Sequence, residues 1–155
     1  MNGDSMTVLQ IIGYWDDSED PMEAIRTPNG FPHPRELVEP GWDGGLKERI
    51  VNYLYCAPMQ RGAWGHAYCR MDLSRDCKEM GSREMTDGTY IWPEGLAVYV
   101  EDYDVRLPAA FLEHMKALDF KVPAVERFLK AEVDDSFWRE WCEAQLGRSF
   151  AKKAR

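Results

Sequence analysis

Residues 83–92 read Arg-Glu-Met-Thr-Asp-Gly-Thr-Tyr-Ile-Trp. Two β-prone runs flank an Asp-Gly pair, which is the dipeptide preferred in tight type I′ turns. The stretch therefore predicts a β-hairpin with Asp87 and Gly88 at the centre of its turn. The segments on either side of this hairpin decide the rest of the fold.

Before the hairpin, the pattern mixes strands with a helix. Residues 8–15 are rich in β-branched and aromatic side chains and predict a first strand. Residues 46–55 repeat apolar side chains at helical spacing after Asp43, and we expect a helix capped by Asp43 that ends before Pro58. Residues 63–71 alternate loosely and predict a further strand.

After the hairpin, the pattern is helical. Three prolines stand where a helix can begin, because the first helical position needs no backbone N–H. They are Pro93, Pro108 and Pro123. Asp134 or Asp135 caps a fourth helix, which Gly147 closes. This order predicts an α+β fold, in which a small antiparallel sheet containing the hairpin at about 83–92 packs against several helices of the C-terminal half.

The 155 residues fit a single domain, 1–155. Residues 16–34 are polar and interrupted by prolines, so we expect a surface loop there. Residues 148–155 carry four basic side chains and no acid, and predict a flexible basic tail. No apolar run approaches the ~20 residues that span a bilayer, and the first residues do not resemble a secretory signal. We therefore expect a cytoplasmic protein with no membrane contact, whose four cysteines are reduced.

Charge is the first indication of function. The chain has 19 basic and 27 acidic residues, a net charge of −8, and residues 1–43 alone hold nine acids and two bases. A negative body repels nucleic-acid phosphates and attracts basic proteins. A net charge of this size can also do no more than keep a small protein soluble. We therefore expect no direct nucleic-acid binding and favour a basic protein partner; carboxylates that mimic nucleic acid along 16–23 and 101–104 are a further interpretation.

One part of the chain resembles a known group. Residues 86–100, followed by Val-Arg-Leu-Pro at 105–108, are similar to a group of small uncharacterised bacterial proteins with a TDG-x-aromatic-x-WPEGL-x-x-YV…VRLP signature. Residues 12–15 and 34–38 fit the same group. The resemblance implies a soluble bacterial protein of one domain, and it implies no established activity.

Members of that group tend to carry a Cys-x-x-Cys before the hairpin and histidines in or just after the following helix. Cys69 keeps the first position of the pair, but Asp72 stands at the second. Val98 and Tyr103 occupy the places of the histidines. A metal site implied by the resemblance is therefore incomplete in this chain.

The chain has other residues that could bind a metal ion. His66, Cys69 and Cys77 could bind zinc, with Cys56 or Asp72 as a fourth ligand. Their spacing matches no strong zinc motif, and unpaired cysteines are commonly core residues. We therefore expect no cofactor and assign no catalytic residue. The alternative that stays open is a small zinc-dependent or thiol enzyme that uses His66, Cys69, Asp72 and Cys77.

The aromatic residues complete the hypothesis. Six Trp, seven Tyr and six Phe exceed the needs of a small core, although most of them can still be core. Trp and Tyr are the residues most enriched at binding hot spots. The expected partner-binding set is Tyr14, Trp15, Asp16, Asp17, Glu19, Asp20, Trp42, Tyr90, Trp92, Glu101, Asp102 and Asp104. The sequence thus favours a non-catalytic acidic protein-binding module, of a bacterial immunity or inhibitor type, that docks on a basic partner such as a toxin domain.

Overall fold

The computed structural model describes residues 7–15, 31–62, 67–125 and 130–150. Within these ranges the strands are β1 (Thr7–Ile11), β2 (Met59–Gly62), β3 (Arg83–Thr86), β4 (Tyr90–Pro93) and β5 (Ala131–Asp134). The α-helices are α2 (Lys47–Cys56), α3 (Leu96–Tyr103), α4 (Ala109–Ala117) and α5 (Ser136–Leu146). The short 3₁₀ segments are η1 (Pro34–Leu37) and η2 (Cys77–Glu79). The fold is α+β.

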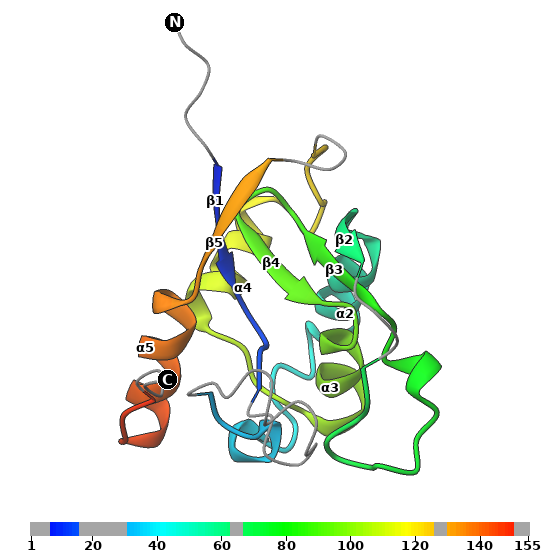
Figure 1. Cartoon of the computed structure of the whole chain (residues 1–155), viewed down its shortest axis with the longest axis vertical. Helices are drawn as coiled ribbons and strands as arrows, with labels where there is room; N and C mark the ends of the chain where they lie inside the picture. The colour runs from blue at the N-terminus through cyan, green and yellow to red at the C-terminus, as the bar shows by residue number, and fades with distance from the viewer. Residues whose placement is uncertain (1–6, 16–30, 63–66, 126–129, 151–155) are drawn as a thin grey trace, which may run out of the picture.

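The strands form one mixed sheet in the order β2-β3-β4-β1-β5 (Figure 1). β3 and β4 pair antiparallel, with Glu84 opposite Pro93 and Thr86 opposite Ile91, so the predicted hairpin is confirmed. β1 pairs in parallel with both β4 and β5. The expectation of an antiparallel sheet therefore holds for β2, β3 and β4 and is wrong for β1 and β5. Parallel neighbours are brought together by long connections, which no local pattern reveals.

The hairpin turn differs from the predicted type. Gly88 has a φ of +90°, whereas Asp87 and Thr89 are outside the positive-φ region. Thr86 is opposite Ile91, so Asp87 is opposite Tyr90 and the central pair of the turn is Gly88 and Thr89. The N–H of Asp87 donates to the carbonyl of Tyr90 at 3.3 Å. A type I′ turn needs a positive φ at both central residues, so the prediction of a type I′ turn centred on Asp87 and Gly88 is wrong.

Helices α2 and α4 lie behind the sheet in Figure 1 and pack on one of its faces. The expectation that the covering helices come from the C-terminal half is therefore only partly right, because α2 precedes the hairpin. Tyr90 and Trp92 carry this packing from β4. The ring of Phe111 lies 4.6 Å from that of Tyr90 and 5.4 Å from that of Trp92, and Tyr53 lies 6.1 Å from Trp92. The indole N–H of Trp92 donates to the carbonyl of Leu54 at 3.2 Å. Buried rings with a satisfied polar atom thus fix the sheet on its helices.

The end of β1 joins two more helices to the core. Trp15 lies 5.6 Å from Tyr99 of α3 and 5.5 Å from Trp138 of α5, both edge to face. Gly13 precedes this cluster with a φ of +78°, and a Cβ at this position would lie 2.6 Å from Leu96. Only glycine fits this bend, because both its backbone conformation and the approach of α3 exclude a side chain.

Several helix boundaries follow the expected signals. α4 begins directly after Pro108, and α5 begins after Asp135 and ends before Gly147, whose φ is +66°. Asp135 stands at the N-cap of α5 without a capping hydrogen bond from its side chain, whereas Asp134 accepts from the N–H of Ser136. The prediction that Pro93 opens a helix is wrong. Pro93 ends β4, and the N–H of Glu94 still bonds to Arg83 of the neighbouring strand at 2.8 Å. The sheet ladder therefore continues past the proline.

Three other expectations are wrong in the described residues. Asp43 does not cap α2, because it has a φ of +47° in a preceding turn and Leu46 stands at the N-cap. Residues 67–71 are not a strand, and residues 63–66 lie outside the described part. The helix predicted to begin at Pro123 is absent at residues 123–125, its continuation at 126–129 lies outside the described part, and Ala131–Asp134 forms β5.

The predicted loop and tail fall partly outside the described residues. Of 16–34, residues 31–34 are described, and Phe31 and His33 are buried. Of 148–155, residues 148–150 are described. Phe150 is buried, and its carbonyl accepts from Nε of Arg139 at 2.8 Å. No helix in the described ranges is both long and apolar enough to cross a membrane.

Candidate functional site

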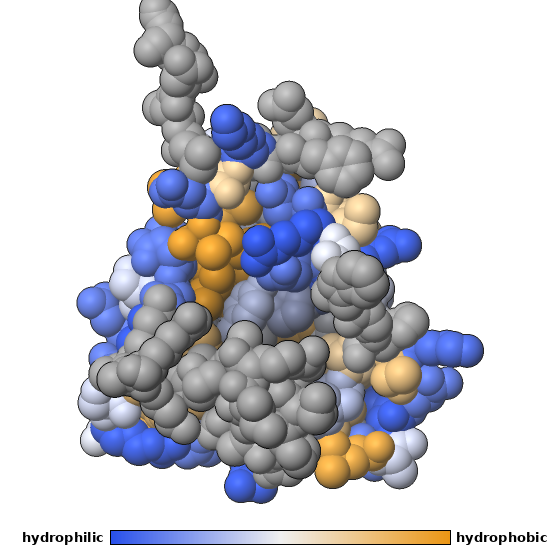
Figure 2. All heavy atoms as spheres, in the orientation of Figure 1, coloured by the Kyte–Doolittle hydropathy of each residue, from blue (hydrophilic) through white to orange (hydrophobic). Residues whose placement is uncertain are grey.

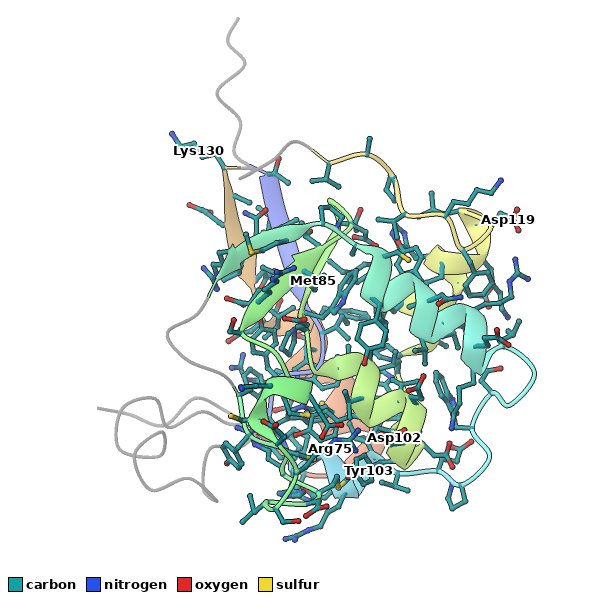
Figure 3. The ribbon with its side chains drawn as sticks, turned by 90° about the vertical axis from the view of Figure 1, so that its right-hand side faces the viewer. Arg75, Met85, Asp102, Tyr103, Asp119 and Lys130 are labelled. Carbon is teal, nitrogen blue, oxygen red and sulfur yellow. The ribbon has the colours of Figure 1, made fainter. Side chains whose placement is uncertain are left out.

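The carboxylates at the end of α3 are engaged by basic side chains. Asp102 pairs with Arg75 at 2.6 Å, and these residues lie together with Tyr103 at one end of the molecule (Figure 3). Asp104 pairs with Lys47, and this contact lowers the pKa of the Asp104 carboxyl. Lys47 also donates to the carbonyl of Glu101 at 3.2 Å. This part of the expected binding set therefore presents ion pairs more than free negative charge.

The aromatic members of the set divide between core and boundary. Trp92 and Trp15 are buried, with 0% and 4% of their surfaces exposed, and they serve the ring contacts of the core. Tyr14, Trp42 and Tyr90 are half-buried and border the core. The remaining members, Asp16, Asp17, Glu19 and Asp20, lie outside the described residues.

The candidate zinc ligands do not gather in the described residues. Cys69 is buried and its Sγ lies 3.8 Å from the hydroxyl of Tyr103, whereas Cys77 is exposed. Asp72 accepts hydrogen bonds from the backbone N–H and hydroxyl of Ser74. His66 lies outside the described part of the chain. No group of three or more His, Cys, Asp or Glu side chains in the described ranges is arranged to hold a metal ion.

A pocket of about 380 Å³ opens beside the sheet. It is lined by Ile11, Tyr14, Phe31, Arg61, Val133, Asp134 and Asp135. Figure 2 shows a hollow on this side, with apolar surface over β1 and β5 at one rim and hydrophilic surface across from it. A volume of this order accommodates a side chain or a small ligand.

One wall of the pocket is a neutralised network. Oε2 of Glu84, on β3, accepts from the hydroxyl of Tyr14, and Oε1 accepts from Nε of Arg61. Nη2 of Arg61 lies 3.3 Å from Oε2 of Glu84. Burial, reinforced by the charge of Glu84, raises the pKa of Tyr14 well above its ordinary value. The phenol therefore stays a hydrogen-bond donor, and Arg61 offsets the charge of Glu84.

The opposite wall has two carboxylates and one arginine. Asp135 forms a two-pronged ion pair with Arg139, with both N–O distances 2.7 Å. Asp134 accepts from the N–H and hydroxyl of Ser136 at 3.0 and 2.8 Å, and these bonds lower the pKa of the Asp134 carboxyl. Within the described ranges no lysine or arginine forms an ion pair with Asp134. This pocket wall is thus net negative at neutral pH.

A second polar network lies at the hairpin turn. The side chain of Asp87 is fully enclosed, and one of its oxygens accepts from the N–H groups of Thr89 and Tyr90 at 2.9 and 2.8 Å. The other oxygen accepts from the hydroxyl of Tyr53 at 2.5 Å and lies 3.0 Å from Nε2 of His114. None of the pocket residues belongs to this network. It joins the turn to α2 and α4, which is a structural role.

Sequence reasoning missed most of the pocket. It predicts Asp134 and Asp135 only as a helix cap, and it finds no functional signal at Arg61, Glu84 or Val133. The neighbouring aspartates before a helix are visible in the sequence. Their position beside β1 is not visible, because it depends on the pairing of β5 with a strand more than a hundred residues earlier. Comparisons with protein-family models, with curated proteins and with solved structures give no match.

Proposed function

We propose that this chain is a non-catalytic, acidic protein-binding module that docks on a basic protein partner, as an immunity or inhibitor protein docks on a toxin domain. The observation that carries the proposal is the net-negative wall of the pocket, where Asp134 has no basic ion-pair partner in the described residues. The net charge of −8 adds a long-range field of the same sign. Such a field accelerates the encounter with a basic partner and disfavours an acidic one.

The zinc or thiol enzyme has less support. Cys69 is buried and Cys77 is exposed, and the other candidate ligands do not converge on them within the described ranges. The four cysteines are all unpaired. Their free thiols agree with a reducing compartment, and we therefore also propose a cytoplasmic location.

The proposed function is tested by isolating the partner. Tagged protein captures partners from cells of its source at low salt, mass spectrometry identifies them, and binding is repeated with each purified partner. We expect a basic protein, whose affinity falls as salt increases because charge attraction is screened. A partner that is acidic, or binding that does not change with salt, would contradict the proposal.

A matched pair of variants links that binding to the pocket. Asp134 and Asp72 each accept from the N–H and hydroxyl of the serine two residues later. Asn keeps this acceptor and removes the charge. We expect Asp134→Asn to weaken the purified complex by about threefold, as for a partly exposed ion pair, and Asp72→Asn to leave it unchanged. If the two substitutions weakened the complex equally, the pocket would not be part of the binding site.

A further inference from the structure

The outer edge of the sheet at β5 is open in the described residues. β5 is the last strand in the sheet order, and it pairs only with β1, from Thr7 opposite Ala131 to Gln10 opposite Asp134. In a strand, alternate residues direct their N–H and C=O groups to opposite sides, so part of the β5 backbone faces away from β1. Such an edge is a template for another strand.

Apolar side chains are exposed beside this edge. Val133 of β5 and Val8 of β1 each expose 46% of their surface. The exposed large hydrophobic residues of the described chain are Val8, Tyr55, Leu73 and Val133. Two of these four therefore lie on the paired strands β1 and β5, and Val133 is on the open edge itself.

The charge of the edge selects its partner. Glu132 is exposed on β5, and Asp134 and Asp135 follow on the wall of the pocket. Lys130 precedes the strand and Arg139 pairs with Asp135, so the three acids and two bases at this edge leave a net charge of −1. Backbone hydrogen bonds alone would not distinguish one extended segment from another. The carboxylates make a segment with Lys or Arg the favoured one and repel an acidic segment.

The pocket lies within reach of such a segment. Val133 is in register with Leu9, and Ile11 with Ile91, so these side chains share one face of the sheet. Val133 and Ile11 line the pocket on that face, and Asp135 lines it just beyond the end of β5. The side chain of Asp134, which is in register with Gln10, lies toward the other face. A strand next to β5 would direct every second side chain to this face. A Lys or Arg there can lay its alkyl stem on Val133 and place its charge near Asp135, and a Lys or Arg directed to the other face can lie near Glu132 and Asp134.

We infer that β5 is the docking edge of this protein, and that the partner contributes an extended basic segment that adds to β5 as a further strand and places one Lys or Arg side chain in the pocket. This inference rests on the proposed function and names the form in which the basic partner binds. Main-chain bonds would supply affinity, and the pocket would supply specificity, as in other cases of strand addition.

Two valines of equal exposure give the test on the protein side. Val133→Lys places a positive charge on the edge and opposes both the apolar contact and a basic segment. Val8→Lys places the same charge on the interior strand β1, on the opposite face. We expect Val133→Lys to weaken the partner complex by about tenfold or more, since like charges at an interface oppose binding strongly, and Val8→Lys by less than about threefold. Circular dichroism of both variants checks that they fold.

A synthetic probe tests the backbone directly. The probe is a blocked fluorescent peptide of alternating lysine and valine, followed by anisotropy at low salt. An analogue with N-methyl groups at alternate residues keeps the charge and cannot pair as a strand. We expect the analogue to bind about tenfold more weakly, the loss of about two hydrogen bonds. We also expect the unmodified peptide to slow amide exchange in residues 131–134.

The outcomes separate this inference from the proposed function. Equal binding of the two peptides, or no binding of either, overturns strand addition, while an isolated basic partner would still support the proposed function. Sedimentation velocity of the protein alone adds one more outcome. A wild-type dimer that Val133→Lys converts to a monomer would show a second copy of this chain on β5 and would also overturn the inference.

Discussion

Tyr53 shows at the scale of one residue how the hairpin turn is held. Its hydroxyl donates to the enclosed carboxylate of Asp87 at 2.5 Å, while its ring packs on Trp92 and Phe111. Phenylalanine keeps the ring and removes the hydrogen bond. We expect Tyr53→Phe to lower the free energy of unfolding by about 1.5–3 kcal/mol, the usual cost of losing a bond to a charged group.

The control for this change lies two residues further along α2. Tyr55 exposes 44% of its surface, so Tyr55→Phe should change the free energy of unfolding by less than about 0.5 kcal/mol. Urea denaturation of both variants measures the difference. Similar changes in the free energy of unfolding for the two variants would mean that the hydrogen bond from Tyr53 to Asp87 does not stabilise the fold.

The four cysteines should differ in reactivity according to burial. Cys56 and Cys77 are exposed, whereas Cys69 and Cys142 are buried. Burial also raises the pKa of the Cys142 thiol to about 12, so little nucleophilic thiolate forms there. A disulfide reagent at pH 8 should label two thiols rapidly in the folded protein and all four in denaturant. Rapid labelling of all four in the folded state would contradict the burial.

Asp134 gives a prediction on pH. Its hydrogen bonds from Ser136 hold its folded pKa below the unfolded value of about 3.9. A carboxyl of this kind stabilises the fold above its unfolded pKa, and that contribution is lost as the pH falls through the lowered folded value. The stability difference between wild type and Asp134→Asn should therefore be larger at pH 7 than at pH 3. Urea denaturation at both pH values checks this, and a constant or growing difference would contradict it.

At the scale of elements, the bend that follows β1 is tightly constrained by α3. Gly13→Ala would place a methyl group 2.6 Å from Leu96 and force an L-residue to a φ of +78°. Strain of this kind costs about 1–3 kcal/mol. At Gly45 a methyl group would have no atom within 4 Å, and the φ of Gly45 is not positive, so Gly45→Ala should cost less than about 0.5 kcal/mol. Thermal denaturation compares the two, and equal melting temperatures would contradict the strain.

The elements also show what local sequence can and cannot predict. The hairpin, α2, α4 and α5 follow from turn residues, apolar spacing and end signals that lie within each segment. β5 does not, because a four-residue strand with one β-branched side chain becomes a strand through its pairing with β1. The pocket is missed for the same reason, since its two walls come from β5 and from the β2–β3 side of the sheet.

At the scale of the whole molecule, one core joins both halves of the chain. Buried hydrophobic residues from Leu9 to Phe150 form a single cluster, and Trp15, Trp92 and Trp138 lie within it. The sheet and its helices should therefore unfold together. Tryptophan fluorescence and far-ultraviolet circular dichroism should give the same urea midpoint. Midpoints that differ beyond error would show that one part unfolds independently.

The position of β1 also has a consequence for synthesis on the ribosome. β1 is the first of the five strands to be translated, yet its neighbours are residues 90–91 of β4 and residues 131–134 of β5. The hairpin can close as soon as its own residues emerge, whereas β1 waits for partners encoded far downstream. Contacts of such long sequence separation slow folding. The nascent chain therefore carries an unpaired apolar strand until residues 131–134 have been translated, and a chaperone would help most during that interval.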